Sequence, residues 1–96
     1  MYRRGPSRHE PLPSPDEFCL NIARGVVGNP GALKVATVEG QNLIVIELSA
    51  PADDVGRLVG RDGRTIGAVR TLAEALGQKI GKRIMVDVQA SARTRP

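Results

Sequence analysis

The chain of 96 residues has almost no aromatic side chains: no tryptophan, one tyrosine and one phenylalanine. Tyr2 lies near the N-terminus, and Phe18 lies in an apolar helical repeat where we expect it to join the core. Several nucleic-acid-binding modules (RRM, OB-fold and cold-shock domains) stack bases on exposed aromatic side chains. The composition excludes these modules because no such platform can be assembled.

Cysteine and histidine are equally scarce, with one of each. Cys19 cannot form an intramolecular disulfide, which favours a reducing, cytoplasmic setting, and we expect it to be a small core residue. His9 lies outside the expected fold, and no Cys/His cluster is present to hold a metal. We therefore expect no enzyme, no metal and no cofactor. No apolar run approaches the roughly 20 residues of a membrane span, so no membrane partner is expected either.

The positive charge of the chain is unevenly distributed. The formal net charge is +4, but residues 14–90 contain nine Lys or Arg and nine Asp or Glu, so the whole surplus lies in the terminal segments. A basic pI is thus weak support for a nucleic-acid-binding fold. The local pattern is more informative, because four arginines between Arg57 and Arg70 face only one acid, Asp62. This segment could attract phosphate, or it could simply be a solvated helix face.

Residues 1–13 and 91–96 are rich in proline, arginine and serine and are expected to be mobile basic tails around a domain at 14–90. The sequence Ser14-Pro15-Asp16-Glu17 predicts the start of a helix, with Ser14 as N-cap. An apolar stripe of Phe18, Ile22 and Val26, with Cys19 and Ala23 beside it, should pack on a sheet. Gly28-Asn29-Pro30-Gly31 ends this helix.

Three strands and two further helices follow. Residues 33–39 and 43–48 are expected to be strands joined by a tight turn at 40–42. A short helix is expected over 53–59, and its buried residues would be Val55, Leu58 and Val59. It precedes a longer helix that runs to about Gln78. The side chains of this longer helix that face inward would be Ile66, Val69, Ala73 and Leu76. Residues 83–89 predict the third strand. The return through two helices favours parallel pairing, so we expect an α+β fold, order α-β-β-α-α-β, with a three-stranded mixed sheet and three helices on one face.

A short glycine link joins the second and third helices in the stretch VGRDGRTIGAV, residues 59–69. A GxxG spacing alone is weak, since the chain repeats it at 25–28 and 28–31. The context at 60–63, inside a strand–helix–helix–strand unit, resembles the KH domain of RNA-binding proteins, and LVGRDGRTIGAVRTLAEAL carries the resemblance. The helix and strand before this unit match the bacterial type II arrangement, and the length is similar to that of small KhpA-like KH proteins.

The resemblance implies single-stranded RNA binding. Glycines let a phosphodiester approach the backbone, the following helix start favours an anion, and arginines supply bidentate hydrogen bonds. The loop residues that clamp RNA would be Gly60, Arg61, Asp62 and Gly63, with Arg64 and Thr65 opening the next helix. Val59 and Ile66 would contribute to a groove for bases, and Arg57 and Arg70 would add charge.

Three residues leave alternatives open. The Asp62 carboxylate would repel phosphate, so we expect its replacement by lysine or glycine to tighten RNA binding. Gly67, inside a helix, is expected to allow close packing against the first helix rather than approach of nucleic acid. Arg83, like its neighbours in the helix–strand connection, would either touch RNA or keep that connection soluble.

Membership of the KhpA-like group would imply a cytoplasmic RNA chaperone or post-transcriptional regulator, linked to cell-envelope growth, division and cell shape. It would also imply a homodimer and pairing with a larger KH protein of the KhpB (Jag) type. Two alternatives remain: a ribosome-associated assembly factor, and a protein–protein interaction module. The module would use the outer sheet face, with Leu43 and Val45 and also Val38 or Met85 as its surface.

Overall fold

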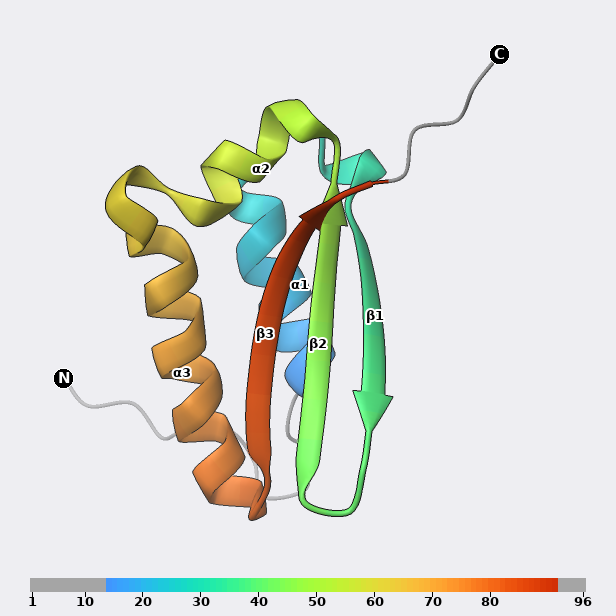
Figure 1. Ribbon diagram of the computed structural model, residues 1–96, viewed down its shortest axis with the longest axis vertical. Helices are drawn as coiled ribbons and strands as arrows, with labels where there is room; N and C mark the ends of the chain where they lie inside the picture. The colour runs from blue at the N-terminus through green and yellow to red at the C-terminus, as the bar shows by residue number, and fades with distance from the viewer. Residues whose placement is uncertain (1–13, 92–96) are drawn as a thin grey trace, which may run out of the picture.

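The computed structural model describes residues 14–91 and has the predicted order of elements (Figure 1). In chain order these are α1 (Pro15–Val26), η1 (Pro30–Ala32), β1 (Lys34–Glu39), β2 (Leu43–Ala50), α2 (Ala52–Val59), η2 (Arg61–Gly63), α3 (Arg64–Ile80) and β3 (Arg83–Ala90), where η marks a single 3₁₀ turn. The predictions of mobile tails concern segments that lie almost entirely outside the described residues.

The sheet is mixed, as expected, with strand order β1-β2-β3. Strands β1 and β2 form an antiparallel hairpin, whose turn is closed by the Gly40 N–H donating to the Leu43 carbonyl at 2.7 Å. Strand β3 lies parallel to β2, with Ile44 opposite Ile84. A parallel neighbour requires a crossover connection, and the chain makes it through α2 and α3.

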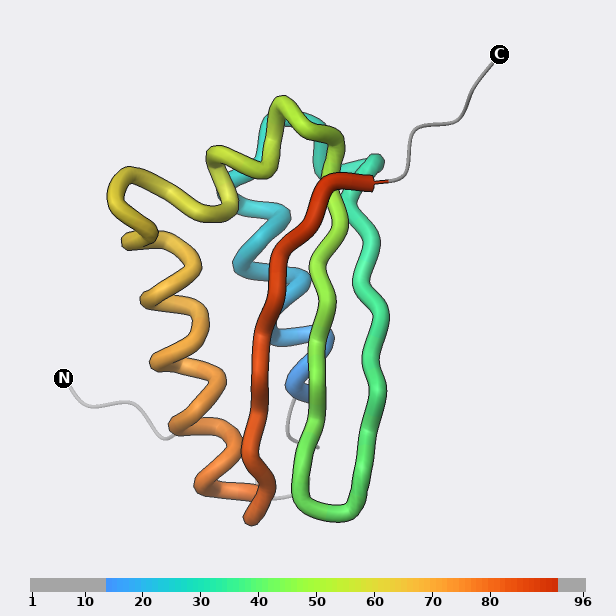
Figure 2. Tube along the Cα trace, in the orientation of Figure 1, coloured from blue at the N-terminus to red at the C-terminus, as the bar shows by residue number. Residues whose placement is uncertain are grey.

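The helices gather on one face of the sheet, and the core lies between the two layers (Figures 1 and 2). Alternate residues of β2 and β3 point into this core, because successive side chains of a strand face opposite sides. The buried apolar side chains are Cys19, Ala23, Leu33, Ile44, Ile46, Leu48, Ala50, Leu58, Ile66, Val69, Ala73, Ile84 and Val86.

Helix α1 packs the predicted apolar face on the core, with Phe18 and Ile22 partly buried, but the centre of the contact is shifted to the small residues. Cys19 and Ala23 are fully buried, whereas Val26 is 38% exposed and Phe18 is half-buried. Small side chains at the centre of the contact let the helix lie close to the sheet. Burial raises the pKa of the Cys19 thiol to about 11, with a further contribution from the nearby charge of Asp16.

Ser14 is the N-cap residue of α1, as predicted, but its hydroxyl does not cap the helix. The Ser14 hydroxyl makes no hydrogen bond to a backbone N–H of the first turn and instead donates to the Glu17 carboxylate at 3.0 Å. Helix α3 extends two residues beyond the predicted end, and its buried positions include Gly77 rather than Leu76, which is half-buried. A Cβ at Gly77 would overlap the Lys82 carbonyl, so this glycine sets the close approach of α3 to the start of β3.

Candidate nucleic-acid interface

The link at residues 60–63, called the glycine loop below, is a single 3₁₀ turn between α2 and α3. The Gly63 N–H donates to the Gly60 carbonyl at 3.1 Å, which closes the turn. Both glycines have positive φ, 80° at Gly60 and 75° at Gly63, a region that costs residues with a Cβ roughly 1–2 kcal/mol. The sequence GxxG therefore encodes a corner that other residues would adopt only with strain.

The two glycines of the loop are needed for different reasons. A Cβ at Gly60 would overlap the Thr65 side chain and lie 2.8 Å from the Thr65 backbone nitrogen, so Gly60 is required by packing inside the loop. A Cβ at Gly63 would have no heavy atom within 4 Å. The backbone at Gly63 consequently faces open space, directly before the first residue of α3.

Asp62 is the one described non-glycine residue with positive φ, at 57°. Aspartate and asparagine tolerate this left-handed conformation better than other side chains because their short polar groups can bond locally. The acid that would repel phosphate thus has a conformational explanation. The Asp62 side chain is exposed and has no ion-pair partner among residues 14–91.

Arg61 and Arg64 supply the positive charge of the loop. Both are exposed, and neither has an ion-pair partner within the described part of the chain. The Arg64 N–H donates to the Arg61 carbonyl, but no side chain caps the first turn of α3, so the N–H groups that follow Arg64 have no side-chain acceptor. The glycine loop therefore combines an exposed backbone, the start of a helix and two guanidinium groups that have no ion-pair partner among the described residues.

Arg57 is held in place by a buried carboxylate that the sequence analysis missed. Asp54 is 3% exposed and accepts hydrogen bonds from the Gly28 N–H at 2.8 Å, the Asn29 N–H at 3.0 Å and Arg57 Nη1 at 2.8 Å. The bond from Gly28 is the main cause that holds the pKa of Asp54 below its usual value, with Arg57 and Asn29 assisting against the cost of burial. Asp54 thereby ties the turn after α1 to α2 and holds the Arg57 guanidinium against that turn, close to Gly28.

The predicted groove residues differ in accessibility. Val59 is half-buried at the end of α2, whereas Ile66 is only 7% exposed and belongs to the core. Thr65 is half-buried against Gly60. Gly67 does not pack against α1 as predicted: it is exposed, and a Cβ there would meet nothing within 4 Å. The prediction of close packing at Gly67 is wrong.

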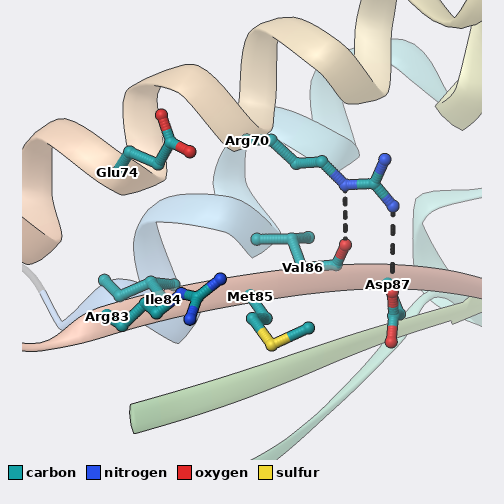
Figure 3. Close-up of a pocket in the computed structure, with 7 residues that line it drawn as sticks. All are labelled: Arg70, Glu74, Arg83, Ile84, Met85, Val86 and Asp87. Atoms are coloured by element: carbon teal, nitrogen blue, oxygen red, sulfur yellow. Dashed lines mark hydrogen bonds and ion pairs between the residues drawn. The ribbon is translucent and has the colours of Figure 1, made fainter. Parts of the chain in front are cut away.

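Arg70 lies about two helical turns beyond the loop and bridges α3 to the free edge of β3 (Figure 3). Its Nε donates to the Val86 carbonyl at 3.0 Å, and its Nη2 lies 3.7 Å from the Asp87 carboxylate. The bridge closes one side of a pocket of about 210 Å³, called the α3–β3 pocket below. The residues around it are Arg70, Glu74, Arg83, Ile84, Met85, Val86 and Asp87.

The sequence predicts only part of this pocket. It indicates Arg70 and leaves two roles open for Arg83, but it assigns no role to Glu74 or Asp87. The spacing of Arg70 and Glu74 on one helix face was a readable signal. The pairing of that face with the edge of β3 required the three-dimensional structure.

Two kinds of site are not found within residues 14–91. No group of three His, Cys, Asp or Glu side chains could hold a metal ion there. No helix of this part of the chain is long and apolar enough to span a membrane.

The fold and its glycine loop define a type II KH domain, in which the loop joins the two helices of the crossover. The family model for the KH domain of KhpA/KhpB matches residues 16–88. The chain belongs to this KhpA/KhpB family. Because the family is non-enzymatic, the prediction that the chain is not an enzyme is confirmed.

Curated relatives agree over most of their own length. The RNA-binding protein KhpA of Caldanaerobacter subterraneus subsp. tengcongensis is 38% identical over 72 residues, covering 75% of this chain and 96% of that protein. The RNA-binding protein KhpA of Aquifex aeolicus is 36% identical over 66 residues, covering 69% of this chain and 84% of that protein. The RNA-binding protein KhpA of Listeria monocytogenes is 32% identical over 73 residues, covering 76% of this chain and 96% of that protein.

Solved structures show the same fold at low identity. The chain is similar to part of Era in its crystal structure with MgGDPNP and nucleotides 1506–1542 of 16S ribosomal RNA. The TM-score is 0.59 at 18% identity, over 88% of this chain and 37% of that one.

Proposed function

We propose that the protein binds single-stranded RNA without catalysis and seats the sugar–phosphate backbone on the glycine loop. The observation that carries this proposal is the open backbone at Gly63 beside Arg61 and Arg64, two arginines without an ion-pair partner among the described residues. A phosphate placed there would receive backbone N–H groups and charge-assisted hydrogen bonds at once. Family membership and the names of the curated relatives support the same function.

The bases would lie along the side of α3 that faces β3. KH domains hold about four nucleotides, with the backbone on the GxxG loop and the bases turned away from it. Val59, Thr65 and Arg57 would border the first nucleotides, and Arg70 would border the later ones. Ile66 would contribute only the small part of its side chain that remains exposed.

The cellular role follows from the family rather than from any residue. We propose an RNA chaperone or post-transcriptional regulator in the cytoplasm, connected with cell-envelope growth, division and cell shape. Self-association and pairing with a KhpB-type KH protein belong to the same proposal. A ribosome-associated assembly role remains the alternative within RNA biology.

Arg61→Asp tests the proposal because it turns the loop into Gly-Asp-Asp-Gly without touching the core. We expect RNA affinity to fall roughly tenfold or more, since one charge-assisted contact becomes a repulsion. Lys34→Asp, on the outer face at the start of β1, is the matched charge-reversal control and should bind like the parent. Equal affinities of parent and Arg61→Asp in fluorescence anisotropy would refute binding at the loop.

The outer sheet face supports a second candidate, a contact between two copies of the chain. Val38, Val45 and Met85 lie opposite one another across all three strands, with Val38 69% and Met85 43% exposed. Such an apolar row on a free face favours burial against a similar row. Val38→Lys should shift sedimentation equilibrium towards the monomer, whereas Gln41→Lys, at the hairpin tip, should not. No shift for Val38→Lys would remove this candidate.

A further inference from the structure

The α3–β3 pocket carries an inference that rests on the proposed function and deepens it. It lies along α3 from the glycine loop: Glu74 follows Arg64 by ten residues, or about 15 Å of helix. An adjoining hollow of about 320 Å³ shares Glu74, Arg83 and Ile84 with it. A strand of RNA that leaves the loop along this side of α3 therefore reaches the pocket within a few nucleotides.

The charged side chains of the pocket fall into a paired set and an unpaired set (Figure 3). Arg70 is committed to the Val86 carbonyl and to Asp87. Glu74 and Arg83, by contrast, are exposed, and their side chains make no ion pair with each other or with any other residue that the structure describes. One free acceptor and one free donor thus line the same pocket.

The charge balance of the pocket selects against phosphate. Two arginines, Arg70 and Arg83, are offset by two acids, Glu74 and Asp87, whereas Arg61 and Arg64 at the loop exceed the single acid Asp62. A free carboxylate repels an anion, but it is a strong acceptor for the N–H groups of a neutral ligand. Ile84 and Val86 also line the pocket, but they are only 6% and 2% exposed, so the charged side chains dominate its accessible surface. A neutral, flat group with donors and acceptors, such as a nucleobase, fits this combination.

We propose that the pocket is a guanine-selective base subsite, with Glu74 and Arg83 as its specificity-determining residues. Guanine presents two adjacent donors, N1–H and the N2 amino group, which match one carboxylate. Its O6 and N7 are the acceptors that arginine contacts most often in nucleic acids. Adenine, cytosine and uracil each lack the pair of adjacent donors. Arg70 acts as a positioning residue, because its bond to the Val86 carbonyl holds the edge of β3 against α3.

The test compares short RNAs that differ at one base. A uridine decamer with a single central guanosine is measured against decamers with adenosine, cytidine or inosine there, each with the parent protein, Glu74→Gln and Glu47→Gln. Inosine differs from guanosine only by the missing N2 amino group. Glu47, on the outer face of β2, provides the matched control. Arg61→Asp is measured with the same RNAs.

The parent should bind the guanosine decamer about tenfold more tightly than the adenosine decamer, with inosine in between, as expected for one bidentate base contact. Glu74→Gln should bring this ratio close to one, and Glu47→Gln should leave it as in the parent. A parent ratio near one, or a ratio that survives Glu74→Gln, would overturn the guanine subsite. If Arg61→Asp still weakens every RNA in that case, the loop proposal stands alone; if it weakens none, both proposals fail.

Discussion

The glycine loop and the α3–β3 pocket lie on one helix but differ in their physical character. At the loop, the backbone is bare at Gly63 and the arginines exceed the acids. In the pocket, side chains form the walls and the charges cancel. Affinity and selectivity would therefore be separable: the loop would attract any phosphate backbone, in a salt-dependent way, while the pocket would discriminate among bases.

The loop itself contains a sharper contrast, between its two glycines, and breaking it should give the largest effect. Gly60→Ala should destabilise the fold by about 2–4 kcal/mol, from left-handed strain and overlap with Thr65. Gly63→Ala should cost only about 1–2 kcal/mol, because its Cβ points into open space, yet it should weaken RNA binding. Urea denaturation and anisotropy measure the two effects. Equal destabilisation by both variants would contradict the assignment of different roles.

Gly67 marks where the bare surface continues one turn into α3. Gly67→Ala should stabilise the protein by about 1 kcal/mol, since glycine inside a helix is unfavourable and the space is open. We expect RNA affinity to fall, because the added methyl group would lie near the bound RNA, but to fall less than for Gly63→Ala, because Gly67 lies outside the loop. Gly25→Ala in α1, equally open, should stabilise without changing affinity. A destabilised Gly67→Ala would show a contact that the structure lacks.

Asp62 weakens the charge contrast between loop and pocket, so neutralising it should sharpen that contrast. Asp62→Asn keeps a side chain that tolerates positive φ and removes one negative charge. RNA affinity should rise by about two- to fivefold, the range of an exposed charge interaction. Asp62→Lys is a poorer test because its longer side chain gains nothing from the left-handed conformation. Unchanged or weaker binding by Asp62→Asn would contradict phosphate binding at the loop.

The last prediction concerns the buried carboxylate of Asp54, whose contribution to the stability of the parent changes only at acidic pH. The pKa of Asp54 is lowered in the fold, so its ionised form stabilises the protein above the unfolded-state pKa of about 3.9. That contribution is lost as the pH falls through the lower, folded-state pKa. The melting temperature of the parent should therefore drop more steeply below about pH 4 than that of Asp54→Asn. Parallel curves for the two proteins would rule out this role.

The element order was predictable because its boundaries are chemically distinct. Gly28-Asn29-Pro30-Gly31 ends a helix, Gly40 closes a hairpin, and two glycines interrupt the crossover. These signals are local, and they placed the glycine loop and its arginines correctly along the chain. Whether those residues bind RNA stays a prediction.

What escaped prediction depends on contacts between distant segments. Asp54 bonds to backbone groups 25 and 26 residues away, which no spacing rule indicates. The inward stripe of α1 is centred on Cys19 and Ala23 because the sheet lies close, and Gly67 is open because α1 does not reach it. The α3–β3 pocket exists only once Arg70 meets the edge of β3.

The most direct test of phosphate binding at the loop is a titration of the isotope-labelled protein with a single-stranded RNA decamer, followed by amide chemical shifts. We predict that the largest changes fall on residues 60–65, with a second set on β3 from Ile84 to Asp87. Changes confined to residues 1–13 and 92–96 would contradict it.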